Sequence, residues 1–442
     1  MNLLAVAAVS SVSFAPGEGR APAIIQYTLS DAPAIVTADI QTNTVADGSG
    51  EWASIGGAAM DEMQGDVNCL VRKDGAKTAT WLPGEYWRNT ALPAAQMRVV
   101  LKAWETNSPP DYMVVNLAGP ANVVRFYENE KSLPGGVADA RYRTTKMAMH
   151  RIPANGVVWW MGSPDDEPYR TADREYRHKV MLTEDYYCAI FPVTYGQQTN
   201  VTGSADTGTI GNTMRTFANL DFRPVNRIRH DTLLGLSEAH ARTAIGTHTA
   251  GSDTPTCTIN MFRTQTGFPN IDIPTEAQWE YACRAGTGTA LNNGTSHNGG
   301  ESAADKAATK VVAYTAWELS NTAKRSSQPV GKKAPNAWGL YDMLGNVYEA
   351  CRDQLSTGSA YTNTFTAGWD DPESPSITTN PVGTATSSIT SWMRRGGSCY
   401  HNGGQSRSAT REGFSFVLKS SVSDNDGFWG YRLIVPVGDV LK

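Results

Sequence analysis

The chain has 442 residues, with 38 lysine or arginine residues against 43 aspartate or glutamate residues and a formal net charge of −5. This length is too great for one ordinary domain and suggests two or three. No basic run stands out, so the sequence lacks the electrostatic footprint of a nucleic-acid-binding protein. No stretch approaches the roughly 18 apolar residues that a membrane-spanning helix needs. We therefore expect neither a nucleic-acid partner nor a membrane span.

Residues 1–137 are predicted to form an all-β, immunoglobulin-like sandwich domain. Short apolar or alternating runs are separated by proline, glycine, asparagine and aspartate at intervals typical of a sandwich. The opening residues lack the basic n-region of a signal peptide, and their alternation favours a first strand. A Pro-Gly-Gly sequence at 134–136 marks the expected boundary. The predicted strands are Ala23–Tyr27, Ala34–Gln41, Val67–Val71, Met97–Trp104 and Tyr112–Leu117, and the predicted core tryptophans are Trp52, Trp81, Trp87 and Trp104.

Two helices are predicted in the second domain, residues 138–442. Near 275, Thr275 can cap a helix and Gln278 can complete a capping box, with Gly286 ending the helix. Apolar spacing favours another helix over Asp231–Thr243. Residues 287–335 have little periodicity and are predicted to be a long connection.

A charged segment of this domain, and the cysteines and histidines of the whole chain, are interpreted as structural residues without catalytic or metal-binding roles. Glu167, Asp173, Arg174 and Glu175 are expected to form a charged turn on a solvated face. The chain has six cysteines without CxxC spacing and seven histidines without HxxH or HExxH spacing. This pattern defines neither a disulfide framework nor a zinc site, and we expect buried free thiols.

The stretch RRGGSCYHNGGQSRSATR, residues 394–411, is the predicted site. Gly396 and Gly397 permit a tight turn or a close approach to a neighbouring strand. The residues that follow have neither a helical nor a strand period, which indicates a loop rich in hydrogen-bonding side chains. Such loops on a rigid scaffold commonly carry binding or catalysis.

Five motifs, in order, resemble the formylglycine-generating enzyme, or sulfatase-modifying factor, family. They are MGSPDDEP (161–168), FPVTYGQ (191–197), IPTEAQWEYACRAG (273–286), PNAWGLYDMLGNVYEACRD (335–353) and RRGGS with the later GYRL. The resemblance covers the chain from about Met147 to Val437. It implies an α+β, C-type lectin-like fold with much irregular chain, preceded by the all-β sandwich domain.

The oxidase chemistry of the family is not expected here. Its oxidising members hold copper(I) with two cysteines after the GGS, and His401 and Ser406 stand at those two positions. Cu(I) selects soft thiolate ligands, and Cys399 is misplaced by two residues. Ser398 matches the family's active-site serine, whereas Tyr348 replaces the tryptophan of the family's GNxWEW motif. We therefore expect no copper and no enzyme activity.

A second branch of the same fold, the variable proteins of diversity-generating retroelements, also resembles the chain. Those elements mutate adenines, so Asn codons become codons for residues such as Tyr, His, Cys, Gly, Ser or Asp. The runs CYHNGG, FSFVL and DNDGF fit this spectrum, and aromatic with small polar residues is the mix that binding surfaces use. Within a candidate variable region of 394–434, the predicted ligand-binding residues are Cys399, Tyr400, His401, Asn402, Gly404, Gln405, Ser406, Thr410, Glu412, Phe414, Phe416, Leu418, Asp424, Asn425, Asp426, Phe428 and Trp429.

The sequence thus favours a non-catalytic, receptor-type protein that binds a protein or glycan ligand through this region. A metal-dependent oxidase of the same family and a structural surface or virion component are the alternatives. The retroelement resemblance implies a cell-surface or phage setting.

The family resemblance also implies one structural metal. The family wraps a calcium ion with the stretch matching Asp342 to Glu349, through two side chains and two backbone carbonyls. The implied ligands are Asp342, Gly345, Val347 and Glu349. Carboxylate and carbonyl oxygens are the ligands that Ca²⁺ prefers.

Overall fold

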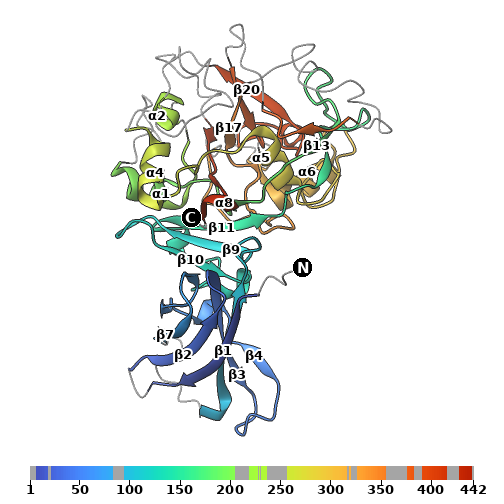
Figure 1. The fold of residues 1–442 in the computed structure, drawn as a ribbon. Helices are drawn as coiled ribbons and strands as arrows, with labels where there is room; N and C mark the ends of the chain where they lie inside the picture. The colour runs from blue at the N-terminus through green and yellow to red at the C-terminus, as the bar shows by residue number, and fades with distance from the viewer. Residues whose placement is uncertain are drawn as a thin grey trace. The chain divides into compact units, whose positions relative to one another are not determined.

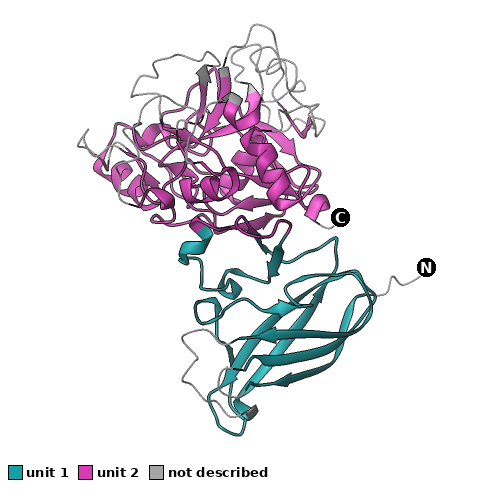
Figure 2. Ribbon diagram, turned by 90° about the vertical axis from the view of Figure 1, so that its left-hand side faces the viewer, with its two compact units in different colours: residues 1–115, 123–142, 441–442 teal, residues 116–122, 143–440 magenta. Residues whose placement is uncertain are grey.

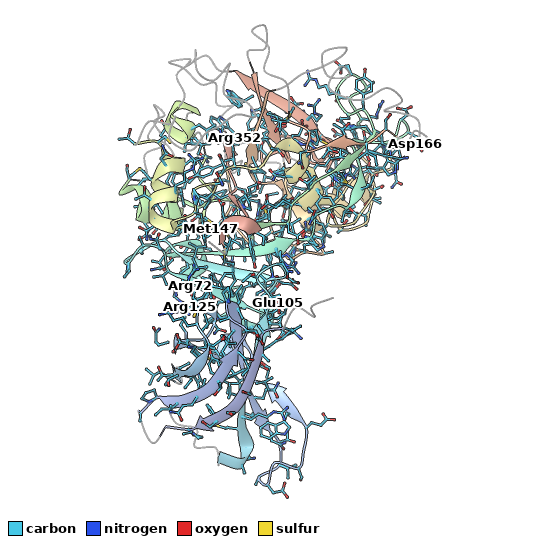
Figure 3. All side chains as sticks on the ribbon, viewed as in Figure 1. Arg72, Glu105, Arg125, Met147, Asp166 and Arg352 are labelled. Carbon is cyan, nitrogen blue, oxygen red and sulfur yellow. The ribbon has the colours of Figure 1, made fainter. Side chains whose placement is uncertain are left out.

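The computed structural model divides the chain into two compact units (Figure 2). Unit 1 comprises residues 1–115, 123–142 and 441–442, and unit 2 comprises residues 116–122 and 143–440. The sequence predicted the change of domain at 137/138. The residues that the structure describes are 6–17, 21–82, 94–204, 219–226, 228, 230–235, 256–315, 318–319, 326–354, 376–382, 391–415 and 428–440.

Unit 1 is all-β, as predicted, and contains two antiparallel sheets and the antiparallel pair β9–β10. One sheet has the order β1-β2-β7-β5, and the other has the order β4-β3-β6 with β8 paired to β3. Alternate side chains of β2 are buried, as expected for a strand with one face on the core. The strands of this unit are β1 (Ala8–Ala15), β2 (Ala23–Ser30), β3 (Ala34–Asn43), β4 (Trp52–Ser54), β5 (Gln64–Gly65), β6 (Cys69–Val71), β7 (Gly75–Trp81), β8 (Met97–Trp104), β9 (Tyr112–Asn116) and β10 (Val124–Tyr127).

Only part of the predicted tryptophan core is found there. Trp81 is buried with residues of both sheets, including Ile25 and Ile40. Trp52 and Trp104 are half-buried instead, and Arg98 and Lys102 cover their rings at 4.4 Å and 3.6 Å from the ring centres. Trp87 lies outside the described residues.

Unit 2 has an α+β fold in which short elements are joined by long irregular segments (Figure 1). Its sheets have the orders β11-β14-β22, β12-β13-β18, β15-β16 and β20-β19-β17-β21. The strands are β11 (Lys146–Ile152), β12 (Val158–Met161), β13 (His178–Met181), β14 (Tyr186–Ala189), β15 (Ala313–Tyr314), β16 (Leu344–Gly345), β17 (Tyr348–Gln354), β18 (Thr378–Thr379), β19 (Ser391–Arg395), β20 (Arg411–Ser415), β21 (Trp429–Gly430) and β22 (Ile434–Pro436). The helices are α1 (Tyr195–Thr202), α2 (His230–Leu234), α4 (Thr258–Thr266), α5 (Glu276–Arg284), α6 (Ala303–Val312) and α8 (Val437–Val440).

Helix α5 confirms the strongest local prediction. The Thr275 hydroxyl accepts a hydrogen bond from the Gln278 amide, and the Gln278 side chain accepts one from the Thr275 amide, completing the capping box. Every residue of the helix except Gln278 is buried, Trp279 included, and the helix packs on β17 and β19. Ala285 takes a left-handed conformation after the last turn, directly before Gly286.

The predicted connection over residues 287–335 is wrong in part, and the predicted helix over Asp231–Thr243 is found only at its start. Helix α6 lies within the segment predicted to be a long connection; its first turn is capped by Ser302, whose hydroxyl accepts from the Asp305 amide. Helix α2 covers the start of the helix predicted over Asp231–Thr243, and residues 236–243 lie outside the described part of the chain.

Candidate functional site

The RRGGS stretch lies on the four-stranded sheet β20-β19-β17-β21. Strand β19 pairs antiparallel with both β17 and β20 and ends at Arg395, directly before the two glycines. Gly396 and Gly397 have φ angles of +91° and +78°. A Cβ on Gly396 would lie 2.6 Å from the carbonyl oxygen of Met343, and one on Gly397 would lie 2.3 Å from the Ser406 hydroxyl. Only glycine fits this close turn.

The loop after the glycines is held by short hydrogen bonds. The Cys399 amide donates to the Asn346 carbonyl at 3.0 Å, and Ser398 Oγ lies 2.8 Å from His401 Nδ1. Residues Gly403–Gln405 form a single 3₁₀ turn. The Asn402 side chain donates to Glu301 at 2.8 Å. These contacts fix the backbone while leaving several side chains on the outside.

Arg395 and Arg411 bind this sheet to helix α5. Arg395 forms ion pairs with Glu280 and Glu276 and donates to the Ser408 carbonyl at 3.0 Å. Arg411 binds both carboxylate oxygens of Glu276, one of them at 2.8 Å. All of these side chains are buried, so each charge is neutralised inside the domain by a directed hydrogen bond.

Arg407 anchors the other end of the loop. Its guanidinium donates to both oxygens of Glu175, at 2.8 and 2.9 Å, to Glu167, and to the Tyr169 carbonyl at 2.8 Å. Glu167 and Glu175 are therefore buried, and the prediction of a solvated charged turn is wrong for them. Burial raises the pKa of Glu167, and the adjacent Arg407 opposes that rise.

Several predicted binding residues belong to this framework rather than to the surface. From their residue types, the small polar residues near the glycines were expected to be exposed. In the structure the loop contacts the GLYDMLGN segment, where the Cys399 amide donates to the Asn346 carbonyl, and these residues are covered. The residues with buried side chains, or for glycine a buried backbone, are Cys399, Gly404, Ser406, Thr410, Phe428 and Trp429.

The remaining described candidates are accessible to solvent. Asn402 is exposed, and Tyr400, His401, Gln405 and Glu412 are half-buried. We call these five residues the outer set. Phe414 lies in β20 and its side chain is not described; Phe416, Leu418, Asp424, Asn425 and Asp426 lie outside the described residues.

Aromatic rings support the outer set from below. Tyr400 stacks on Phe428 with ring centres 5.9 Å apart and an angle of 11° between the planes. His401 meets the Tyr348 ring edge-on at 5.0 Å. These rings give the loop a rigid, partly apolar base.

The residues at the family's copper positions do not fit that metal. His401 Nδ1 faces Ser398, and the Ser406 hydroxyl is buried against the two-glycine turn. A hydroxyl is a poor ligand for Cu(I), which needs thiolates, and the Cys399 side chain is fully buried.

The two predicted side-chain ligands of calcium, Asp342 and Glu349, already accept hydrogen bonds from protein donors and do not fit an ion either. Both Glu349 oxygens accept from Arg432, at 2.8 and 3.0 Å, and one also accepts from the Trp279 indole at 2.8 Å. Asp342 accepts from the Gly331 amide at 2.6 Å, and its burial raises its pKa to about 6. Within the described ranges there is no group of three or more His, Cys, Asp or Glu residues arranged to hold a metal.

We therefore expect EDTA to leave thermal unfolding unchanged, with a shift in the melting temperature below about 1 °C, because Glu349 already has a cation partner. Differential scanning calorimetry with and without EDTA, followed by calcium addition, measures this. A saturable rise in melting temperature with calcium would restore the predicted site.

His178, beside the Arg411–Glu276 pair, gives the domain a pH dependence. Burial lowers its pKa from 6.5 to about 4. Between these values the unfolded chain binds a proton that the folded chain does not, so stability falls as the pH falls from 6.5 to 4. We expect this histidine to account for a loss on the order of 3 kcal/mol. Urea unfolding at several pH values should show a shallower acid loss in His178→Gln; parallel curves for the variant and the parent would refute this assignment.

Sequence comparison assigns unit 2 to a known family. Residues 139–435 match the family described as the sulfatase-modifying factor enzyme 1-like domain. The chain belongs to this family and has its C-type lectin-like α+β fold, as the motifs predicted.

Individual relatives resemble the chain only distantly. The chaperone protein LppX of Paenibacillus barcinonensis is 24% identical over 211 residues, covering 45% of this chain and 72% of LppX. The formylglycine-generating enzyme of Thermomonospora curvata is 31% identical over 129 residues, covering 28% of this chain and 37% of that enzyme.

Two solved structures are similar to the chain as well. Treponema denticola variable protein 1 has a TM-score of 0.42 and 18% identity, covering 66% of this chain and 95% of its own. PvdO from Pseudomonas aeruginosa has a TM-score of 0.44 and 20% identity, covering 66% and 94%.

None of the helices in the described part of the chain is long and apolar enough to cross a membrane.

Proposed function

We propose that this protein is a non-catalytic, receptor-type member of its family that binds a protein or glycan ligand through the outer set. We further propose that it is a variable protein of a diversity-generating retroelement. One observation carries the proposal. Arg395, Arg407 and Arg411 are buried and ion-paired, whereas the five residues of the outer set, which lie between or next to them in the sequence, reach solvent.

A diversified binding site requires this separation between buried residues that hold the loop and exposed residues that contact the ligand. Arg395, Arg407 and Arg411 are each bound to glutamates elsewhere in the domain, so the charged anchors of the loop lie outside the outer set. From the outer set, His401 and Asn402 add one side-chain hydrogen bond each, to Ser398 and Glu301. Substitution of exposed residues away from such contacts usually changes stability by less than about 0.5 kcal/mol. The outer set can therefore vary without unfolding the domain.

The chemistry of the outer set also suits recognition. Tyrosine and histidine offer rigid area, and asparagine, glutamine and glutamate offer hydrogen bonds. The stacked Tyr400–Phe428 pair restricts the motion of one contact residue before a ligand binds, which lowers the entropic cost of association.

Sequencing the gene from sister isolates tests the proposal. We expect differences to concentrate at the outer set and at neighbouring positions of 399–429, while Arg395, Arg407 and Arg411 stay constant. Differences spread evenly over unit 2, or an invariant outer set, would argue for the structural alternative.

Family membership makes an oxidase the second candidate. With Cu(I) and a cysteine-containing peptide, we expect no oxygen consumption above that of copper and peptide alone, because His401 and Ser406 replace the required thiolates. An oxygen electrode measures this. Turnover by the parent chain that is lost in His401→Ala would overturn the non-catalytic proposal.

A further inference from the structure

Arg394 differs from the other three arginines in the 394–411 stretch. It lies on β19 opposite Ala350 of β17 and Glu412 of β20. Successive side chains of a strand point to opposite faces, and Arg395 points to the glutamates of α5. Arg394 therefore lies on the face of the sheet that is turned away from α5.

No residue in the described ranges neutralises this cation. Arg394 is 7% exposed, and its Nε atom is buried without an acceptor. Its guanidinium carbon lies 4.3 Å from the centre of the Tyr348 ring, which is its aromatic support. Glu412, its neighbour across the strands, is instead 3.4 Å from Arg174. A buried guanidinium without an anion is unfavourable unless another group supplies the acceptor.

A second buried donor lies beside it. The Tyr348 hydroxyl is buried and has no hydrogen-bond partner among the described residues. Two adjacent donors that both lack an acceptor are a recurrent reason to look for a bound group. The Tyr348 ring also touches His401 at 5.0 Å between ring centres, so these donors lie directly under the outer set.

We propose that Arg394 binds a carboxylate group of the ligand, with Tyr348 holding the guanidinium in place; this rests on the proposed function. The planar fork of arginine matches a carboxylate with two parallel hydrogen bonds. A doubly charged phosphate is less suitable, because the Glu412 carboxylate on the adjacent strand repels it more strongly. The ligand therefore carries an acidic side chain or a sugar acid at the end that meets Arg394.

Titration of the full chain with acetate tests the anchor, with acetamide as the neutral control of the same shape. Ligand-observed NMR should show saturable binding of acetate and none of acetamide. Arg394→Gln should weaken acetate binding at least about tenfold, as expected for the loss of a charge-assisted hydrogen-bond pair. Glu412→Gln should strengthen binding by removing the repulsion.

Arg177→Gln is the matched control, because Arg177 also covers an aromatic ring, that of Trp160 at 4.7 Å, but is exposed. It should bind acetate within about twofold of the parent, since it leaves the site intact. Arg394→Lys keeps the charge, so its intermediate affinity supports the proposal if Arg394→Gln fails to fold. Glucuronate and Nα-acetylglutamate methylamide then identify which source of carboxylate binds more tightly.

The proposal is overturned if acetate and acetamide bind equally, if no carboxylate shows saturable binding, or if Arg394→Gln binds acetate as the parent does. These results would leave the outer set as a binding surface without this anchor. The comparison of sister isolates tests that surface independently.

Discussion

Replacing Arg407 with glutamine is expected to lower the free energy of unfolding by about 3–5 kcal/mol, one of the largest effects of any single substitution in the loop. Arg407 is the shared partner of Glu167 and Glu175, and all three side chains are buried. The substitution leaves two carboxylates close together without a cation. Urea unfolding followed by tryptophan fluorescence measures the loss.

Asp165→Asn is the control for this prediction. It removes an ion pair of similar length, Arg170–Asp165 at 2.9 Å, but the Asp165 side chain is 92% exposed. We expect a loss below about 1 kcal/mol, because water already solvates the Asp165 carboxylate. Equal losses in the two variants would contradict the view that burial makes Arg407 the anchor of the loop.

Gly396→Ala is expected to destabilise the domain by about 2–6 kcal/mol and to displace the loop. The estimate joins about 1–3 kcal/mol for a side chain at positive φ with about 1–3 kcal/mol for overpacking. The new methyl group would meet the Met343 carbonyl at 2.6 Å and the Trp279 ring at 3.0 Å. Urea unfolding again gives the magnitude.

Gly286→Ala separates the two contributions. Gly286 has a φ of +86°, close to that of Gly396, but a Cβ there would meet no atom within 4 Å. Its loss should be only about 1–3 kcal/mol, from backbone strain without the overpacking contribution. If both variants lose the same amount, the close contact under the GGS turn does not constrain the loop.

Local signals in the sequence predicted local structure well. The capping box at Thr275 and the alternation in β2 depend on residues within a few positions of one another, and both are found as predicted. Helix α6 was missed although its sequence, AADKAATKVV, repeats apolar residues every four positions, which is helical spacing, so the signal that could have found it was local too. The family motifs supplied the fold of unit 2, which periodicity alone does not indicate.

The buried contacts that hold the loop could not be predicted from short stretches of sequence. The partners of Arg407 lie 240 and 232 residues away in the chain, so nothing near the GGS motif indicates them. For the same reason Cys399, Ser406 and Thr410 were expected at the surface, whereas the fold encloses them. The outer set could be predicted as candidates from residue type, but separating it from the framework required the three-dimensional contacts.

The most direct test of the central claim is the DNA that flanks the gene. We expect a near-copy of the codons for residues 394–434 that differs almost only at adenines, with a reverse-transcriptase gene beside it. The differing codons should include those of Tyr400 and His401 and should exclude those of Arg395, Arg407 and Arg411. Intact flanking sequence without such a copy would contradict the claim that this loop is a diversified binding surface.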